Sequence, residues 1–193
     1  TNDTKKTKKP TEDDEDDDDE KVAATKNSDS LSKNVYYSFV NSSTSYLLDY
    51  NTTATPDFSV RTWQETHSWD NNKTYFYQGF FLNSSDLIAT CGDARVLSYN
   101  SGSKAFAWIL NSNSSTSNKV VLKKIGSTNE YVIINETSNM ILEHSGTIPT
   151  TGPTGEAAMT IAVKAPTKLT DTTSRQRWKI VPISGYPAST CKN

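Results

Sequence analysis

Residues 39–50 read FVNSSTSYLLDY, two apolar segments on either side of a polar turn. The pattern returns as FLNSSDLIAT at residues 81–90 and as IINETSNMILEH at residues 133–144. Apolar residues that flank a short polar turn in this way are typical of a β-hairpin. Repetition of one such unit along a chain indicates an assembly of similar units that share a core.

The first and third copies align without a gap, as YSFVNSSTSYLLD (37–49) and YVIINETSNMILE (131–143). This alignment pairs Asn41 with Asn135, and one deletion brings Asn83 of the middle copy to the same place. Two apolar doublets in the second strands are predicted to lie in the core, namely Leu47-Leu48 and Ile141-Leu142.

A third strand and a closing strand are predicted after each hairpin. Helix signals are nearly absent, because Gly, Pro, Asn, Ser and Thr recur every few residues. We therefore predict an all-β domain, a β-trefoil of three pseudo-repeats with four strands each, since three such units close economically as a barrel capped by hairpins. The third strands are FSVRTW (58–63), KAFAW (104–108) and AMTIAVK (158–164), and the closing strands begin at Asn72, Asn118 and Arg175.

The last closing strand contains Gln176-Arg177-Trp178, which resembles the Gln-X-Trp element that closes the repeats of ricin B-type lectins. The third hairpin, with YVIIN at residues 131–135, resembles the repeat opening of that family. The resemblance covers nearly everything beyond the N-terminal tail. In the first two repeats, Lys73-Thr74-Tyr75 and Lys119-Val120-Val121 are predicted to stand where Gln-X-Trp would be.

The first repeat is predicted to hold the main sugar site. A sugar offers hydroxyl groups, which need charged or amide partners, and an apolar face, which packs on an aromatic ring. The resemblance implies an acid at the end of the hairpin, an aromatic residue after it and an Asn before the closing element. These are Asp49, Trp63 and Asn72, and Trp69 adds a second stacking face. A core position for Trp63 stays open as an alternative.

The second repeat is predicted to hold a weaker sugar site. It keeps an aromatic residue, Trp108, and an amide, Asn118. Thr90 stands where the resemblance implies the acid, and Asp93 is close enough in sequence to replace it.

The third repeat is predicted not to bind sugars. It keeps an acid, Glu143, but has Lys164 where the ring is expected and Arg175 where the Asn is expected. Its closing-strand Trp178 is predicted to pack in the interior, as this residue does in related folds.

Residues 1–33 are predicted to form a disordered tail. They contain seven Lys and eleven Asp or Glu residues, including an acidic run at residues 12–20, and almost no large apolar side chain. Such a segment buries too little apolar surface to offset the entropy of ordering it. Its role stays open between an electrostatic arm for a basic partner, a weak cation sink, a cleavable spacer and a solvated linker. The domain is assigned to residues 34–187, and residues 188–193 form a C-terminal tail.

Two features bear on the cellular compartment, the cysteines and the N-glycosylation motifs, and the motifs together with the composition favour a secreted or cell-surface protein. The only cysteines, Cys91 and Cys191, would pair in an oxidising compartment and tie the C-terminal tail to the domain, although two unpaired thiols remain an alternative. No apolar run is long enough to span a membrane. Motifs for N-glycosylation, which also arise by chance in a chain rich in Asn, Ser and Thr, occur at Asn2, Asn41, Asn51, Asn72, Asn83, Asn113 and Asn135.

No enzymatic activity is predicted. The only histidines are His67 and His144, and neither occurs in a recognisable nucleophile motif. Both are interpreted as surface or turn residues beside an acid, Asp70 and Glu143 respectively. The sequence has no phosphate-binding glycine loop and no metal-ligand spacing, so no cofactor or metal is expected. Its basic residues are scattered, which argues against a nucleic-acid partner.

These features together predict a lectin domain whose partners are glycans or glycoproteins. It would act as an adhesin, an agglutinin or the targeting subunit of a larger toxin, and in the last case it would have a partner protein chain. The alternative is a protein-binding β-trefoil, such as an inhibitor or an assembly component, that has lost its sugar sites.

Overall fold

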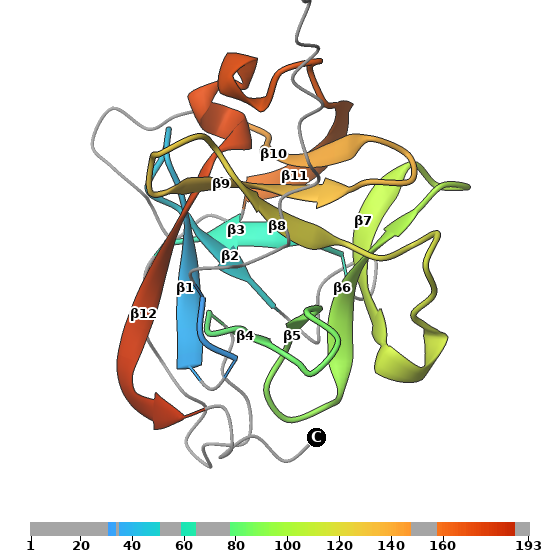
Figure 1. Ribbon diagram of the computed structural model, residues 1–193, viewed down its shortest axis with the longest axis vertical. Coiled ribbons are helices and arrows are strands. Elements are labelled where there is room, and N and C mark those ends of the chain that lie inside the picture. Colours follow the sequence, from blue (N-terminus) through green and yellow to red (C-terminus); the bar gives the residue numbers. More distant parts are fainter. Residues whose placement is uncertain (1–30, 34, 51–58, 65–77, 148–157, 188–193) are drawn as a thin grey trace, which may run out of the picture.

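The computed structural model describes residues 31–33, 35–50, 59–64, 78–147 and 158–187 (Figure 1). Within these residues the chain is all-β, with three short 3₁₀ helices at η1 (Asn111–Asn113), η2 (Leu169–Asp171) and η3 (Ser174–Gln176). None of the described helices is long and apolar enough to cross a membrane.

The described strands form two antiparallel sheets. The larger has eight strands in the order β10-β11-β3-β2-β1-β12-β9-β8, and the smaller has four in the order β4-β5-β6-β7. The eight are β1 (Val35–Asn41), β2 (Leu47–Asp49), β3 (Arg61–Trp63), β8 (Val121–Lys124), β9 (Glu130–Asn135), β10 (Met140–His144), β11 (Ala158–Lys164) and β12 (Trp178–Pro187). The four are β4 (Phe81–Leu82), β5 (Ile88–Ala89), β6 (Arg95–Asn100) and β7 (Ala105–Leu110).

The three predicted hairpins are confirmed as β1–β2, β4–β5 and β9–β10. Their registers correspond, because the residue before each repeated Asn pairs with a residue six positions after that Asn in the first and third hairpins and five positions after it in the middle hairpin, which is one residue shorter. Figure 1 shows β1 lying beside β12, so the first hairpin is joined to the last strand of the chain. The register pairs are Val40 with Leu47, Leu82 with Ile88, and Ile134 with Ile141.

The repeated Asn joins its hairpin to a closing strand from elsewhere in the chain. Asn41 is 1% exposed and donates from Nδ2 to the carbonyl oxygens of Arg175 and Arg177, at 2.9 and 3.4 Å. Asn135 is 0% exposed and donates in the same way to Ser117 and Lys119, at 3.0 and 2.8 Å. Amide nitrogens held in this way are poorly placed to carry a glycan, so these two motifs are weak candidates for glycosylation in the folded chain.

The third strand of the middle unit is β6 and not the predicted segment around Trp108. β5 pairs with β6 through Ala89 and Val96, just as β2 pairs with β3 through Leu48 and Thr62. The predicted segment is β7, an additional strand that pairs with β6. Only a short bend separates β6 from β5, so the amino-acid sequence gives little signal that a new strand begins there.

The closing strands are also displaced from the sequence alignment. Tyr37 pairs with Phe80 in the same way as Tyr131 pairs with Trp178. The counterpart of Gln176-Arg177-Trp178 in the first unit is therefore Gln78-Gly79-Phe80, another Gln-X-aromatic element. The predicted Lys73-Thr74-Tyr75 lies outside the described residues. In the second unit the carbonyl contacts of Asn135 make Asn118-Lys119-Val120 the counterpart, one residue earlier than predicted.

Trp108 lies in the aromatic centre of the core. Its ring stacks on Phe80 with centroids 5.0 Å apart and meets Tyr50 edge-on at 5.5 Å. Trp178 is 0% exposed and donates from Nε1 to the carbonyl oxygen of Leu142 at 3.2 Å. The core prediction for Trp178 is thus confirmed, as is the prediction for both apolar doublets, Leu47-Leu48 and Ile141-Leu142.

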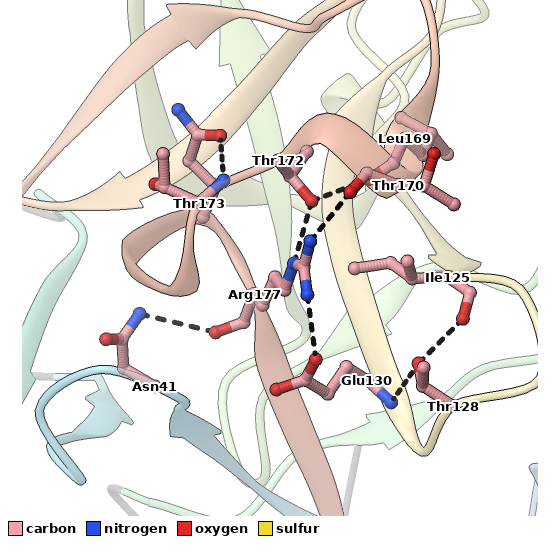
Figure 2. Close-up of polar contacts among 10 residues, drawn as sticks. Asn41, Ile125, Thr128, Glu130, Leu169, Thr170, Thr172, Thr173 and Arg177 are labelled. Carbon is pink, nitrogen blue, oxygen red and sulfur yellow. Dashed lines mark hydrogen bonds and ion pairs between the residues drawn. The ribbon is translucent and has the colours of Figure 1, made fainter.

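Arg177 fixes the segment that leads into β12 (Figure 2). Its Nε donates to Thr172 Oγ1 at 3.0 Å, Nη2 donates to the carbonyl oxygen of Thr170 at 2.8 Å, and Nη1 contacts Glu130 Oε2 at 3.4 Å. Thr173 and Gln176 form a capping box around η3. The backbone around Gln176 is therefore held in place before the polypeptide enters the barrel.

The predicted border between tail and domain falls among residues that contact the domain. Leu31 packs against the core, and the Ser32 amide donates to the Tyr37 hydroxyl at 2.8 Å. Lys33 forms an ion pair with Asp86 at 2.9 Å. The rest of the predicted N-terminal tail and the C-terminal tail lie outside the described residues.

Candidate functional site

Asp49 ends β2 and is held from two sides. Arg61, its cross-strand partner on β3, donates from Nε to Asp49 Oδ1 at 2.8 Å. Gln78 donates from Nε2 to Asp49 Oδ2 at 3.4 Å and to the carbonyl oxygen of Gln64 at 2.8 Å. Asp49 is only 4% exposed, so its carboxylate orients its neighbours more than it faces solvent.

Trp63 lies two residues beyond Arg61 on the same face of β3. Its ring is half-buried, and the Arg61 guanidinium carbon lies 4.9 Å from the ring centroid. This distance is within the range of a cation–π contact. Trp63 is therefore not one of the buried core aromatics, and the structure joins two of the predicted site residues, Asp49 and Trp63, through an arginine that the sequence analysis did not single out.

The electrostatics of this cluster follow from burial. Desolvation raises the pKa of Asp49 above its ordinary value, and the charge of Arg61 with the hydrogen bonds from Arg61 and Gln78 acts in the opposite direction. Among the described residues, the Nη1 and Nη2 groups of Arg61 have no hydrogen-bond partner. The arginine is thus anchored at Nε while its outer donors stay unused.

The same acid–amide pair recurs in the third unit. Gln176 donates from Nε2 to Glu143 Oε2 at 2.7 Å, as Gln78 does to Asp49. Each glutamine begins a Gln-X-aromatic element, and this spacing in QGF at residues 78–80 was the signal that could have revealed Gln78 in the sequence.

The register places Val163, and not the predicted Lys164, at the position of Trp63 in the third unit. Lys164 and Arg175 both contact backbone. Lys164 donates to the carbonyl oxygen of Ser138 at 2.9 Å. Arg175 donates to the carbonyl oxygens of His144 and Gly146, at 3.3 and 2.8 Å. Both side chains therefore support the hairpins and loops of this unit.

The weaker second site does not assemble as predicted. Trp108 is 1% exposed, because it stacks in the core, and it offers no face to a ligand. Asn118 closes its own loop, accepting from the Ser115 amide at 2.8 Å and donating to the carbonyl oxygen of Asn113 at 3.1 Å. The register places Leu97, and not an aromatic residue, at the position of Trp63.

Asp93, the predicted acid of that site, belongs to a closed polar network. Thr90 donates to Asp93 Oδ1 at 2.7 Å, the hydroxyl of Tyr50 donates to Oδ2, and Arg95 forms an ion pair with Oδ2 at 3.3 Å. Arg95 also donates from Nη1 to the carbonyl oxygen of Trp108. These contacts use the groups that a ligand would need.

Three of the predicted residues in or near these sites have no described position, namely Asn51, Trp69 and Asn72. Cys191 also lies outside the described residues. Cys91 is 3% exposed and accepts a hydrogen bond from the Tyr36 hydroxyl at 3.0 Å, and the described residues contain no free cysteine. The pairing of Cys91 with Cys191 stays a prediction.

His144 is buried, so its interpretation as a surface or turn residue was wrong. Its ring stacks on Tyr46 with centroids 5.4 Å apart, and Nδ1 lies 3.1 Å from Thr62 Oγ1. Burial, with the nearby charge of Arg175, lowers the pKa of His144 to about 4. His67 lies outside the described residues, and those that are described contain no cluster of His, Cys, Asp and Glu suited to a metal ion.

The remaining described glycosylation motifs differ in exposure. Asn113 is exposed on η1. Asn83 is half-buried, and its Oδ1 accepts from the amides of Ser85 and Leu87, at 2.9 and 3.0 Å. Of the described motifs, Asn113 is therefore the most accessible.

The sequence matches no known protein-family model and no curated protein sequence. Its fold is similar to that of solved structures. One, described as the BEL beta-trefoil in an apo crystal form, is 18% identical with a TM-score of 0.57, and the match covers 81% of this chain and 99% of that chain. Another, SeviL bound to asialo-GM1 saccharide, is 12% identical with a TM-score of 0.51, covering 79% and 99% respectively. At such low identity the likeness concerns the fold alone, and the chain has a β-trefoil fold.

Proposed function

We propose that this protein is a carbohydrate-binding module whose glycan site is formed by Trp63, Arg61 and Asp49. The observation that carries the proposal is the half-buried Trp63 ring beside an arginine that is anchored by Asp49 and whose outer donors have no partner in the described part of the chain. The aromatic face suits the apolar C–H side of a sugar, and the guanidinium donors suit its hydroxyl oxygens.

The roles within this site differ from those in the sequence prediction. Because Asp49 is 4% exposed and accepts from both Arg61 and Gln78, it acts as a positioning residue. Arg61 is the polar group that contacts the sugar. A rigid pair of this kind limits the side-chain entropy that binding would otherwise cost.

Two further observations support the proposal. SeviL, a protein of similar fold, is bound to a saccharide in its solved structure. The Gln-X-aromatic elements at Gln78 and Gln176 each hold an acid, a feature that fits a ricin B-type arrangement of three pseudo-repeats. We include that arrangement in the proposal, together with a secreted or surface location and a role as adhesin or targeting subunit.

A glycan array with the purified protein tests the proposal. We expect selective binding that is lost in Trp63→Ala and weakened in Arg61→Met. Arg95→Met is the matched control, because Arg95 occupies the corresponding position in the second unit, and its outer donor already contacts the carbonyl oxygen of Trp108. If the folded protein binds no glycan, or if Trp63→Ala binds as wild type does, the proposal is wrong.

A protein-binding β-trefoil is the second candidate, and the burial of Asp49 favours it. Asp49 is 4% exposed and its carboxylate already accepts a hydrogen bond from Arg61. This is expected of an acid that has lost its role in sugar binding and kept a structural one. A negative array, together with co-purification of a partner protein that Trp63→Ala releases, would establish this second function.

A further inference from the structure

On the side of strands β2, β3, β11 and β10 that faces away from the core, two apolar residues are exposed to solvent. Met159 and Ile161 on β11 are 46% and 44% exposed. They are two residues apart, so both point to the same side of the sheet. On the opposite side, Thr62 and His144 are 0% exposed and face the core.

Register places this apolar pair between the two acid–amide pairs. Arg61 is the cross-strand partner of both Asp49 and Met159, and Glu143 is the partner of Ile161. Cross-strand partners share a face, so Arg61 with Met159 and Ile161 with Glu143 form two neighbouring rows on one face, two residues apart along β11. Trp63 lies on the same face next to Arg61. We call these five residues the outer face.

The outer face changes chemical character along its length. At one end Arg61 has unused Nη donors among the described residues. At the other end Glu143, which is half-buried, accepts from Gln176 at Oε2, and no described residue donates to its Oε1. The apolar pair lies between a donor end and an acceptor end.

This spatial order of donor, apolar and acceptor groups fits an oligosaccharide better than a single sugar. From Arg61 on β3 to Glu143 on β10 the face crosses two strand spacings, about 10 Å, and the step from Met159 to Ile161 adds about 7 Å along the strand. The two ends are therefore about 12 Å apart, which is longer than one sugar ring. Sugar hydroxyl groups both donate and accept hydrogen bonds, so one chain satisfies both ends, while its C–H faces cover the apolar middle.

We infer that the outer face is a single elongated site that binds an oligosaccharide lying from Arg61, across Met159 and Ile161, to Glu143. This inference rests on the proposed carbohydrate-binding function and deepens it. The first and third units then contribute to one site, although the third unit lacks the ring and the Asn expected of an independent sugar site.

Binding of long and short glycans tests the inference. The probes are the asialo-GM1 saccharide and its terminal disaccharide, with matched long and short pairs of other glycans on the same array. Wild type is expected to prefer the longer member of a pair by about tenfold. The double variant Met159→Thr/Ile161→Thr should lose this preference and keep its affinity for the short member, because Trp63 and Arg61 are unchanged.

Val181→Thr is the matched control. Val181 lies on β12 and is 47% exposed, about as exposed as each of the two residues in the double variant. Its replacement therefore removes exposed apolar surface of the same kind away from the outer face. It should retain the length preference. Glu143→Gln, which keeps the shape and alters the acceptor end, should weaken only the longer glycans.

Each outcome decides a separate point. Binding without a length preference, or a preference that survives the double variant, overturns the elongated site and leaves the proposed function intact. Absence of binding to every glycan rejects both. A change in sedimentation of the double variant, with the length preference retained, would identify the outer face as a contact between copies of this chain and reject the inference.

Discussion

Asn41 and Arg175 are 134 residues apart in sequence, yet the Asn41 amide donates to the Arg175 carbonyl oxygen at 2.9 Å. The same amide reaches the carbonyl oxygen of Arg177 (Figure 2). Its Oδ1 accepts from the Ser43 amide and the Thr44 hydroxyl, each at 3.2 Å. One side chain therefore shapes the first hairpin and ties it to the end of the barrel.

Replacing this side chain should destabilise the fold. Asn41→Ala removes the Nδ2 donor to the Arg175 carbonyl oxygen and the Oδ1 acceptor within the turn, while the Arg177 carbonyl oxygen keeps the Ser42 amide. We expect a loss of about 2–4 kcal/mol in the free energy of unfolding. Asn135→Ala should cost a similar amount, because its contacts are equivalent. Urea denaturation with an unchanged m-value measures the loss. The control is Ser84→Ala, on an exposed turn, which should change stability by less than about 0.5 kcal/mol.

Among the N-glycosylation motifs, those whose Asn side chain is exposed to solvent should carry a glycan, and those whose Asn is buried should not. When the protein is made in a host that adds N-linked glycans, Asn113 should be occupied, whereas Asn41 and Asn135 should stay unmodified, because their amide nitrogens are buried and donate to carbonyl groups. Mass spectrometry of peptides after enzymatic deglycosylation gives the occupancy. Quantitative modification of Asn135 in the folded protein would contradict the assignment.

The two tryptophans that the sequence treated alike should separate in mutagenesis. Trp108→Ala removes a ring stacked between core aromatics and should cost about 3–5 kcal/mol of stability. Trp63→Ala should cost about 1 kcal/mol, because the ring is only half-buried, and should act mainly on glycan binding. Thermal unfolding and the glycan array, applied to both variants, measure the two effects. A large loss of stability in Trp63→Ala would instead identify Trp63 as part of the core.

Stability should fall in mild acid because of His144. Its pKa is lowered to about 4 in the folded chain from an ordinary value of 6.5, so the unfolded chain takes up the proton first. The stabilising effect of neutral His144 is complete above pH 6.5 and is lost as the pH falls toward 4. Asp49 changes the stability with pH in the opposite direction, because its raised pKa means that protonation favours the folded state.

Unfolding measured between pH 7 and 4 checks this dependence. His144→Phe keeps a ring against Tyr46 and removes the titrating group, so its stability should change less than that of wild type over this range. If the free energy of unfolding falls equally steeply with pH in wild type and in His144→Phe, His144 does not cause the acid sensitivity.

The hairpins were predictable from sequence because their signals are local. Apolar alternation around Asn41, Asn83 and Asn135 directly encodes two strands and a turn, and all three hairpins form. The middle unit was harder to predict. The bend between β5 and β6 leaves little sequence signal, so the alignment selected the segment around Trp108, which is an additional strand.

The sequence alone determined the hairpin units, the buried doublets and the value of Asp49 and Trp63 as candidate site residues. Only the tertiary structure decided that Trp108 lies in the core and that Arg61 joins Asp49 to Trp63. The physical reason is that burial and side-chain pairing depend on which strands become neighbours. Gln78 is 29 residues from Asp49 in the chain, and strand pairing is what brings the two together.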